Sequence, residues 1–213
     1  MKVLITAGPT REAIDPVRYI SNRSSGKMGF ALAAAGVSAG HEVVLVAGPC
    51  GEETPEGVRR VDVVTAEEMY EAVAREIGGM DAAIFSAAVA DYRPVSVSED
   101  KIKKTGERMV LEMARTKDIL GSARGEMGFE GVLMGFAAET GDVEANALGK
   151  LERKGCDLLV ANDVSRRDIG FDSEENEVVV YFASGRVERP GKAGKRDLAG
   201  VLMEYVEEMA VSG

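Results

Sequence analysis

Short apolar runs of strand length alternate along the chain with stretches in which apolar residues recur at helical spacing. The predicted strands of this alternating part cover 3–5, 42–46, 58–64, 81–86, 108–113, 131–135 and 157–160. The predicted helices cover 27–39, 65–77, 142–154 and the stretch that begins with Thr116 as its cap. Strands that alternate with helices are typical of a parallel sheet with right-handed crossovers. The pattern therefore predicts an α/β fold built as a three-layer, Rossmann-like, mostly parallel sheet.

The C-terminal part departs from this alternation. Residues 176–182 and 186–188, joined by Ser184 and Gly185, predict an antiparallel hairpin at one edge of the sheet. An amphipathic helix is expected from about Lys195 onward. The length of 213 residues and the 45% share of hydrophobic residues suit a single domain over 1–213, with a lid or arm at about 92–113.

The segment between the first predicted strand and the first helix is unusually long. It runs to about Ser25, whereas strand-to-helix loops commonly have about 2–6 residues. The loop is rich in arginine, and the helix begins after Ser24, Ser25 and Gly26. Free amide groups at a helix N-terminus attract phosphate, and small residues let it approach closely. The alternative is that a serine merely caps the helix, and the local pattern favours neither interpretation over the other.

Composition excludes several classes of function. A net charge of −10 argues against nucleic acid or an anionic membrane as a partner. The two cysteines lack metal-type spacing, the single histidine removes Ser–His and Cys–His machinery, and no apolar run approaches the ~18 residues of a membrane span. The first residues show no signal-peptide pattern, so a cytoplasmic protein is expected. A G-x-G-x-x-G fingerprint is absent after the first strand, which speaks against NAD or a flavin.

One long string resembles a known enzyme family. Residues 5–33, ITAGPTRE-IDPVRYISNRSSGKMGFALA, closely resemble the opening of phosphopantothenoylcysteine synthetase, the ligase that often forms the C-terminal half of a bifunctional flavoprotein of coenzyme A biosynthesis. Further matches recur at predicted strand ends as far as Asp163. The resemblance implies a ligase that joins 4′-phosphopantothenate to L-cysteine. It implies CTP as the activating co-substrate, an acyl-cytidylate intermediate, and pyrophosphate and CMP as products.

The resemblance also implies roles for individual residues. Asn22 would stabilise the oxyanion when cysteine attacks, Lys101 of the K-x-K-K lid would act beside the reacting phosphate, and Asp91 would bind nucleotide and Mg²⁺. The nucleotide would also lie against Phe85, Ser86, Ala87, Lys117, Asp118, Ile119, Leu120, Phe136, Lys150 and Lys154. Ser24, Ser25 and Gly26 would bind phosphate. At Lys117 the chain departs from the family string N-P-D-I, which has proline there.

Partners follow from the same resemblance. A homodimer is expected, with the lid near the partner's site, and a phosphopantothenoylcysteine decarboxylase is a further possible partner. CTP is expected to be preferred over ATP because the string is similar to bacterial synthetases. Two other classes stay open as alternatives, a dinucleotide-dependent oxidoreductase and a nucleotide sensor without catalytic activity. A basic tetrapeptide such as 101–104 is also often only a solvated surface.

Overall fold

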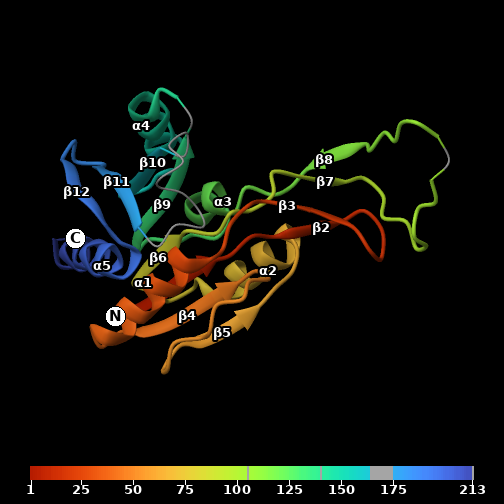
Figure 1. Cartoon of the computed structure of the whole chain (residues 1–213). Coiled ribbons are helices and arrows are strands. Elements are labelled where there is room, and N and C mark those ends of the chain that lie inside the picture. The colour runs from red at the N-terminus through yellow and green to blue at the C-terminus, as the bar shows by residue number, and fades with distance from the viewer. Residues whose placement is uncertain (105, 140, 164–174, 213) are drawn as a thin grey trace.

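An eight-stranded sheet forms the centre of the molecule in the computed structural model, which describes residues 1–104, 106–139, 141–163 and 175–212 (Figure 1). The strands of this sheet are β1 (Lys2–Ala7), β4 (Glu42–Ala47), β5 (Arg59–Asp62), β6 (Ala82–Phe85), β9 (Val132–Glu139), β10 (Leu158–Asp163), β11 (Glu175–Phe182) and β12 (Val187–Gly194). Their order is β12–β11–β10–β9–β6–β1–β4–β5. All pairs from β10 to β5 are parallel, and β11 runs antiparallel to both of its neighbours. The predicted fold class is confirmed.

Helices cover both faces of the sheet. They are α1 (Lys27–Ser38), α2 (Ala66–Glu76), α3 (Ile119–Gly125), α4 (Val143–Lys154) and α5 (Lys195–Ser212). Side chains alternate along β1, so that Val3 and Ile5 join the core beneath α1 and α5, whereas Leu4 joins the core beneath α2, α3 and α4. Because both faces of the sheet are buried, the parallel strands appear in the sequence as continuous apolar runs. The sequence pattern could predict these strands for that reason.

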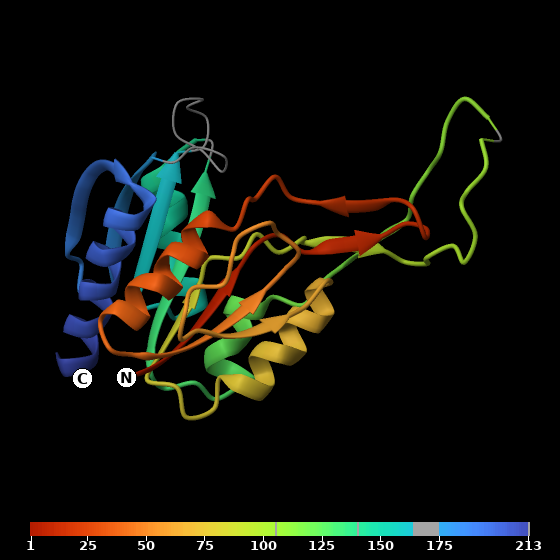
Figure 2. The same ribbon diagram turned by 60° about the horizontal axis from the view of Figure 1, so that its bottom comes forward.

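A long arm leaves the sheet at the side where its parallel strands end (Figures 1 and 2). Two short antiparallel pairs build it, β2 (Arg11–Ala13) with β3 (Tyr19–Ser21), and β7 (Tyr92–Pro94) with β8 (Met113–Arg115). The loop 95–112 lies at the far end of the arm. One residue of the expected lid, residue 105, lies outside the described part of the chain.

Two predictions near the arm were wrong in detail. The strand expected at 108–113 begins only at Met113 and pairs with β7, because the apolar side chains of 109–111 have no sheet to cover. The helix expected after Thr116 begins at Ile119 with Asp118 as its N-cap, whose carboxylate accepts the N–H of Gly121 at 2.9 Å. Thr116 instead donates its hydroxyl to the carbonyl of Ala90 at 2.6 Å. Thr116 thus ties β8 to the turn after β6.

The C-terminal hairpin and helix agree with the sequence. β11 and β12 form the predicted antiparallel edge, and α5 begins at Lys195. In the described part of the chain, no helix has both the length and the apolar character to cross a bilayer.

Helix α1 approaches the sheet very closely at Gly29, and substitution there tests the packing. A Cβ atom at Gly29 would lie 2.7 Å from the Ser86 hydroxyl oxygen and closer still to the side chain of Ala7. We expect Gly29→Ala to lower the free energy of unfolding by about 1–3 kcal/mol, because α1 must move away from the sheet. Gly200→Ala in α5 is the matched control: its Cβ meets no atom within 4 Å, so it should raise stability by about 0.5–1 kcal/mol. Urea unfolding would measure both, and equal effects would contradict the close contact.

Candidate active site

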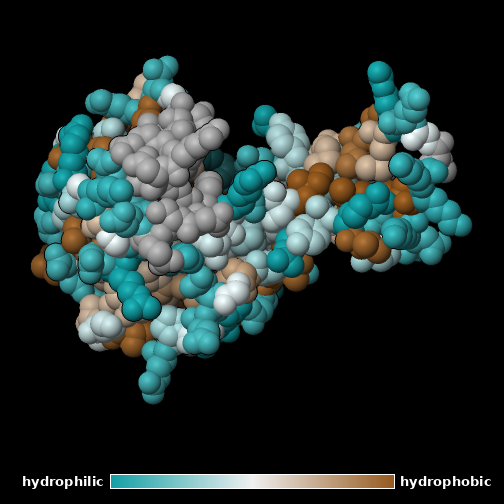
Figure 3. Space-filling view, in the orientation of Figure 1, coloured by the Kyte–Doolittle hydropathy of each residue, from teal (hydrophilic) through white to brown (hydrophobic). Residues whose placement is uncertain are grey.

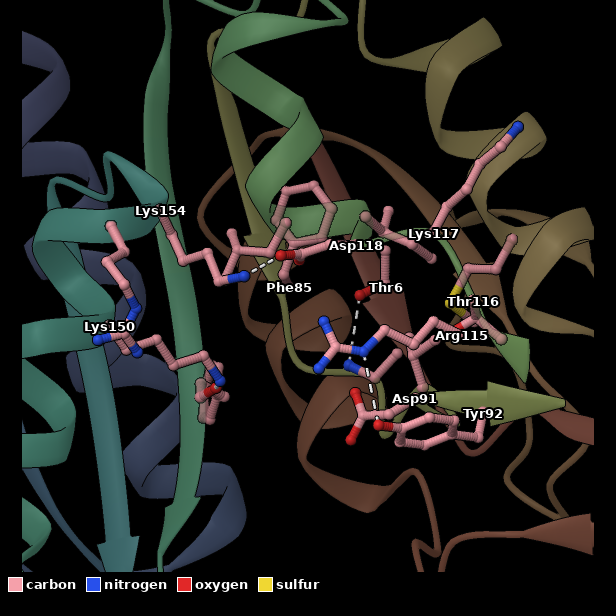
Figure 4. A pocket seen from close by; sticks show the side chains of 17 residues that line it. Thr6, Phe85, Asp91, Tyr92, Arg115, Thr116, Lys117, Asp118, Lys150 and Lys154 are labelled. Atoms are coloured by element: carbon pink, nitrogen blue, oxygen red, sulfur yellow. Dashed lines mark hydrogen bonds and ion pairs between the residues drawn. The ribbon is translucent and has the colours of Figure 1, made fainter. Parts of the chain in front are cut away.

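Two adjoining pockets open at the carboxyl ends of β1, β6 and β9. The first, here called the α3 pocket, has a volume of about 540 Å³ and is lined by Thr6, Met69, Phe85, Ala87, Val89, Asp91, Tyr92, Phe136, Lys150, Arg153, Lys154 and the turn 115–120 (Figure 4). The second, the α1 pocket, has about 380 Å³ and is lined by 22–29, 86–89, Asp91, Phe136, Ala138, Lys150, Asn162, Asn176 and Lys195. The pockets share Ala87, Val89, Asp91, Phe136 and Lys150. One elongated ligand can therefore occupy both.

The α1 pocket contains the predicted phosphate-binding residues at the start of α1. Gly26 is the N-cap, with φ of 84°, and no side chain caps the helix at this position. The Ser24 hydroxyl oxygen accepts the Gly26 N–H at a long 3.4 Å. A left-handed glycine next to the first helical turn leaves backbone amides turned toward the pocket mouth. This geometry suits a phosphate group better than the capping alternative.

Asn22 lines the α1 pocket and holds the turn after β6. Its side-chain nitrogen donates to the carbonyl oxygens of Ala88 and Val89, each at 3.0 Å. Both amide hydrogens thus point at backbone acceptors in this structure. Donation from Asn22 to an oxyanion would require one of these two bonds to be exchanged for the ligand.

The turn 86–91 is tied to the end of β1 by several further hydrogen bonds. The Ser86 hydroxyl donates to the carbonyl of Thr6 at 2.8 Å, and the N–H of Ala87 reaches the Thr6 hydroxyl at 3.3 Å. The N–H of Ala88 donates to the carbonyl of Gly8 at 3.0 Å. These bonds, together with those from Asn22 to the carbonyls of Ala88 and Val89, fix the backbone of the turn.

Basic side chains reach the α3 pocket from α4. Lys154 forms an ion pair with the carboxylate of Asp118, and Lys150 donates to the carbonyl of Phe136 at 2.6 Å (Figure 4). These residues are four positions apart on one helix and share a face. Phe85, Asp91, Ile119 and Leu120, which the resemblance assigns to the nucleotide, also line the pocket, and their contact with a nucleotide stays a prediction.

The side chain of Lys117 points away from this pocket. Figure 4 shows this direction, and the ammonium group lies 2.8 Å from a carboxylate oxygen of Glu67 and 4.3 Å from the centre of the Tyr70 ring, both on α2. The hydrogen bond to Glu67 raises the pKa of Lys117. Lys117 therefore borders the pocket through its main chain. Its ion pair with Glu67 attaches the turn 115–118 to α2, at the position where the family string has proline.

Several lining residues were missed by the sequence analysis. Arg115 and Arg153 add positive charge to the α3 pocket, and Asn162, Asn176 and Lys195 line the α1 pocket. Arg115 was missed because the preceding strand was placed too early in the chain. Arg153 follows Glu152 in a helix with many charged residues. Neither Asn176 nor Lys195 carries a local signal, because Asn176 is on β11 and Lys195 begins α5, and only the packing of these elements brings them to the pocket.

Lys101 is the predicted site residue that this structure does not bring to the pockets. It is exposed on the loop 95–112 and lines neither pocket of its own chain. The loop lies at the end of the arm, away from the sheet ends (Figure 2). A role for Lys101 in chemistry therefore requires movement of the arm or a pocket on a second chain.

The pocket charges favour an anion. Arg115, Lys150, Arg153 and Lys154 face only two carboxylates among the lining residues, those of Asp91 and Asp118. Among the residues that the structure describes, no three histidine, cysteine or acidic side chains gather as a metal cluster. Asp91 borders both pockets, and one carboxylate is enough for Mg²⁺ when a substrate's phosphate oxygens and water complete the coordination.

Comparison with known proteins places the chain in a family. Residues 1–209 match the model of the DNA/pantothenate metabolism flavoprotein C-terminal domain. The chain belongs to this family. It is 50% identical over 190 residues to the coenzyme A biosynthesis bifunctional protein CoaBC of Vibrio vulnificus, a match that covers 88% of this chain and 47% of that protein. It is 45% identical over 209 residues to the Bacillus subtilis CoaBC protein, covering 98% of this chain and 50% of that one. The chain thus spans about half the length of these relatives.

Solved structures of family members share the whole fold. A crystal structure of the C-terminal domain of a CoaBC protein superposes with a TM-score of 0.85 at 41% identity, covering 100% of this chain and 96% of that one. The DNA/pantothenate metabolism flavoprotein from Streptococcus pneumoniae gives a TM-score of 0.83 at 25% identity, covering 98% and 99%. Because both alignments span nearly the full chain, they include the arm as well as the sheet.

Lys154 offers a direct test of the anion pocket. We expect Lys154→Gln to weaken the binding of a nucleoside triphosphate by about 10–100-fold, because a hydrogen bond to a charged group contributes about 1.5–3 kcal/mol. Lys2→Gln, at the opposite end of β1, is the matched control and should leave binding unchanged. Isothermal titration calorimetry would measure both affinities. Unchanged binding in Lys154→Gln would exclude this lysine from the nucleotide site.

Proposed function

We propose that the chain is a phosphopantothenate–cysteine ligase, formed by one domain over 1–213 with a lid at about 92–113. The observation that carries the proposal is the pair of adjoining pockets that share Asp91, Phe136 and Lys150, in a chain that aligns over its full length with the C-terminal domain of a CoaBC protein. Fused pockets suit a reaction in which a nucleotide activates a second substrate. The name of the relatives, coenzyme A biosynthesis bifunctional protein, supports the same assignment.

The reaction has two displacement steps. A carboxylate oxygen of 4′-phosphopantothenate attacks the α-phosphorus of CTP, and pyrophosphate leaves with the bonding electron pair. The amino group of L-cysteine then attacks the acyl carbon, a proton is lost from nitrogen, and CMP leaves. The products are phosphopantothenoylcysteine, CMP and pyrophosphate. Both steps depend chiefly on positioning and on stabilisation of developing negative charge.

The residues divide between the two ends of the nucleotide. The base lies in the α3 pocket between Phe136 and the turn 117–120, and Lys150 and Lys154 supply positive charge for the phosphates of the nucleotide. The triphosphate extends past Asp91 toward the amides at Ser24, Ser25 and Gly26. Asp91 would hold Mg²⁺ together with the substrate's phosphates, and the ion would supply positive charge that stabilises the leaving pyrophosphate.

Asn22 acts in the second step of this proposal. Its amide nitrogen lies beside the Ala88–Val89 peptide, at the boundary between the pocket and the arm. A neutral amide can transfer one hydrogen bond from a carbonyl to the oxyanion formed by cysteine attack, without a change of protonation state. In the resting structure the same bonds keep the turn 88–89 in place.

The arm indicates a homodimer in which Lys101 serves the partner's pocket. Val17, Tyr19, Tyr92, Val95, Val97, Met109 and Val110 are exposed large apolar residues of the arm, and Val110 is 91% exposed (Figure 3). Apolar side chains gathered on a protruding arm are typical of an interface. A second copy of the chain would cover these side chains. In such a dimer, the lid of each chain would lie over the pocket of the other chain. A cytoplasmic location fits these water-soluble substrates, and a decarboxylase half or partner fits relatives of twice the length.

The assignment and the preferred nucleotide can be tested together. Purified protein is supplied with 4′-phosphopantothenate, L-cysteine, Mg²⁺ and either CTP or ATP, and the adduct is measured by mass spectrometry. We expect adduct with CTP, and a kcat/KM for CTP above that for ATP by up to about 10⁴–10⁵, because a site that pairs specific polar atoms rejects ligands that lack them. Similar values would exclude a cytosine-specific pocket. Absence of adduct with both nucleotides would overturn the ligase.

Subunit mixing tests whether Lys101 acts on the partner's pocket. Asn22→Ala and Lys101→Gln should each reduce turnover by about 10²–10³ as pure dimers. If Lys101 acts across the interface, co-refolded dimers should regain about one quarter of the wild-type rate, since half of the dimers are mixed and each has one intact site. Mixing Asn22→Ala with Asn22→Ala, Lys101→Gln double-variant protein is the control and should regain nothing. If the first mixture regained no activity, Lys101 would act on the pocket of its own chain.

A further inference from the structure

One buried carboxylate links the two halves of the arm. Asp15 lies in the turn between β2 and β3, and its side chain has no exposed surface, although the arm around it protrudes into solvent. One carboxylate oxygen accepts the N–H groups of Val17 at 2.9 Å and Arg18 at 2.8 Å. These bonds shape the hairpin turn, as is common for aspartate.

The other carboxylate oxygen reaches across to the lid. It accepts the N–H of Ile102 at 3.1 Å, and the Arg18 guanidinium donates to it at 3.0 and 2.5 Å. The same guanidinium donates to the Ile102 carbonyl at 3.0 Å. Asp15 and Arg18 thus hold both polar groups of one lid residue. A second tie joins the N–H of Ser98 to the carbonyl of Ile14 at 3.0 Å.

The chemistry of this contact suits a permanent anchor. The hydrogen bonds from Arg18 keep the pKa of the Asp15 carboxyl far below its ordinary range, so the carboxylate stays charged. Charge-assisted hydrogen bonds are roughly twice as strong as neutral ones. The loop 95–112 connects the two short strands β7 and β8, and a long loop without contacts of this kind along its length samples many conformations.

Ile102 lies between two of the exposed lysines of the lid. Lys101 and Lys103 are exposed, whereas Ile102 is partly buried against the hairpin. We propose that Asp15 is a positioning residue that fixes the lid backbone at Ile102 and thereby sets where the Lys101 side chain begins. The inference rests on the proposed function for its catalytic consequence, because Lys101 is the lid residue assigned to the reacting phosphate. The anchoring itself does not depend on the ligase reaction.

Limited trypsin digestion tests the anchor without any activity measurement. Asp15→Asn keeps the shape of the side chain but presents an amide to the donors of Ile102 and Arg18. We expect cleavage after Lys101, Lys103 and Lys104 to accelerate at least about tenfold, because the loop opens more often. Asp100→Asn is the matched control on the same exposed loop and should cleave at the wild-type rate. Equal cleavage of Asp15→Asn and wild type would overturn the anchor.

Hydrogen exchange keeps the test independent of the variant's folding. In the wild-type protein, the amide hydrogen of Ile102 should exchange at least about tenfold more slowly than those of the exposed Lys103 and Lys104. Exchange of all three at the same rate would overturn the anchor even if Asp15→Asn failed to fold.

Kinetics then test the route through Lys101. Asp15→Asn should lower kcat about tenfold or more while the KM for nucleotide stays within about twofold, because the nucleotide pocket is untouched. In the Lys101→Gln background, Asp15→Asn should cause no further loss, since both changes remove the same contribution. A further loss as large as in the wild-type background would show that Asp15 does not act through Lys101. If no variant or wild-type protein forms product, the proposed function fails, and the digestion result still decides the anchor.

Discussion

The chain that leaves β1 is hydrogen-bonded to the chain that leaves β6, and both pockets depend on this constraint. The N–H of Ala88 donates to Gly8, the N–H of Ala90 reaches the Thr10 hydroxyl at 2.9 Å, and the Asn22 amide reaches back to Ala88 and Val89. Thr10 is fully buried. Buried backbone groups need partners, so these two segments stabilise each other outside the sheet. The bonds fix the wall between the pockets and the point from which both halves of the arm extend.

Close approach of α1 to this wall is the second requirement. Gly29 lets the helix lie directly on Ala7 and Ser86, and the left-handed Gly26 turns the preceding chain so that its amides face the pocket. A larger residue at either position would separate the helix from the strand ends. Backbone packing thus sets how closely the start of α1 approaches the ends of β1 and β6.

The basic residues of the α3 pocket already have partners within the protein. Lys154 pairs with Asp118, Lys150 with the Phe136 carbonyl, and Lys117 with Glu67. A ligand that bound Lys154 and Lys150 would have to replace these two contacts, so its net gain in binding free energy would be smaller than each new ion pair suggests. These contacts also hold the side chains of Lys150 and Lys154 at the pocket before a ligand binds.

The sequence by itself determined the sheet, its covering helices and much of the pocket. Buried parallel strands appear as apolar runs, and residues at their ends, such as Asp91 and Phe136, must gather at one edge of the sheet. Lys150 and Lys154 were identified through the family string, and the helix spacing placed them on one face. These features follow from local patterns, because burial and helical periodicity act over a few neighbouring residues.

The tertiary structure alone decided the rest. The arm has no apolar alternation strong enough to mark β2, β3 and β7. β2 and β3 pair as a short local hairpin, whereas β7 pairs with β8 across the loop 95–112. Ile102, which donates its N–H to Asp15, is 87 residues away along the chain. Asn176 on β11 and Lys195 on α5 reach the α1 pocket only because these elements pack beside it. The direction of the Lys117 side chain likewise depends on Glu67 and Tyr70 of another helix. Contacts of this kind depend on how elements that are distant in the chain pack together, and the local sequence pattern does not predict that packing.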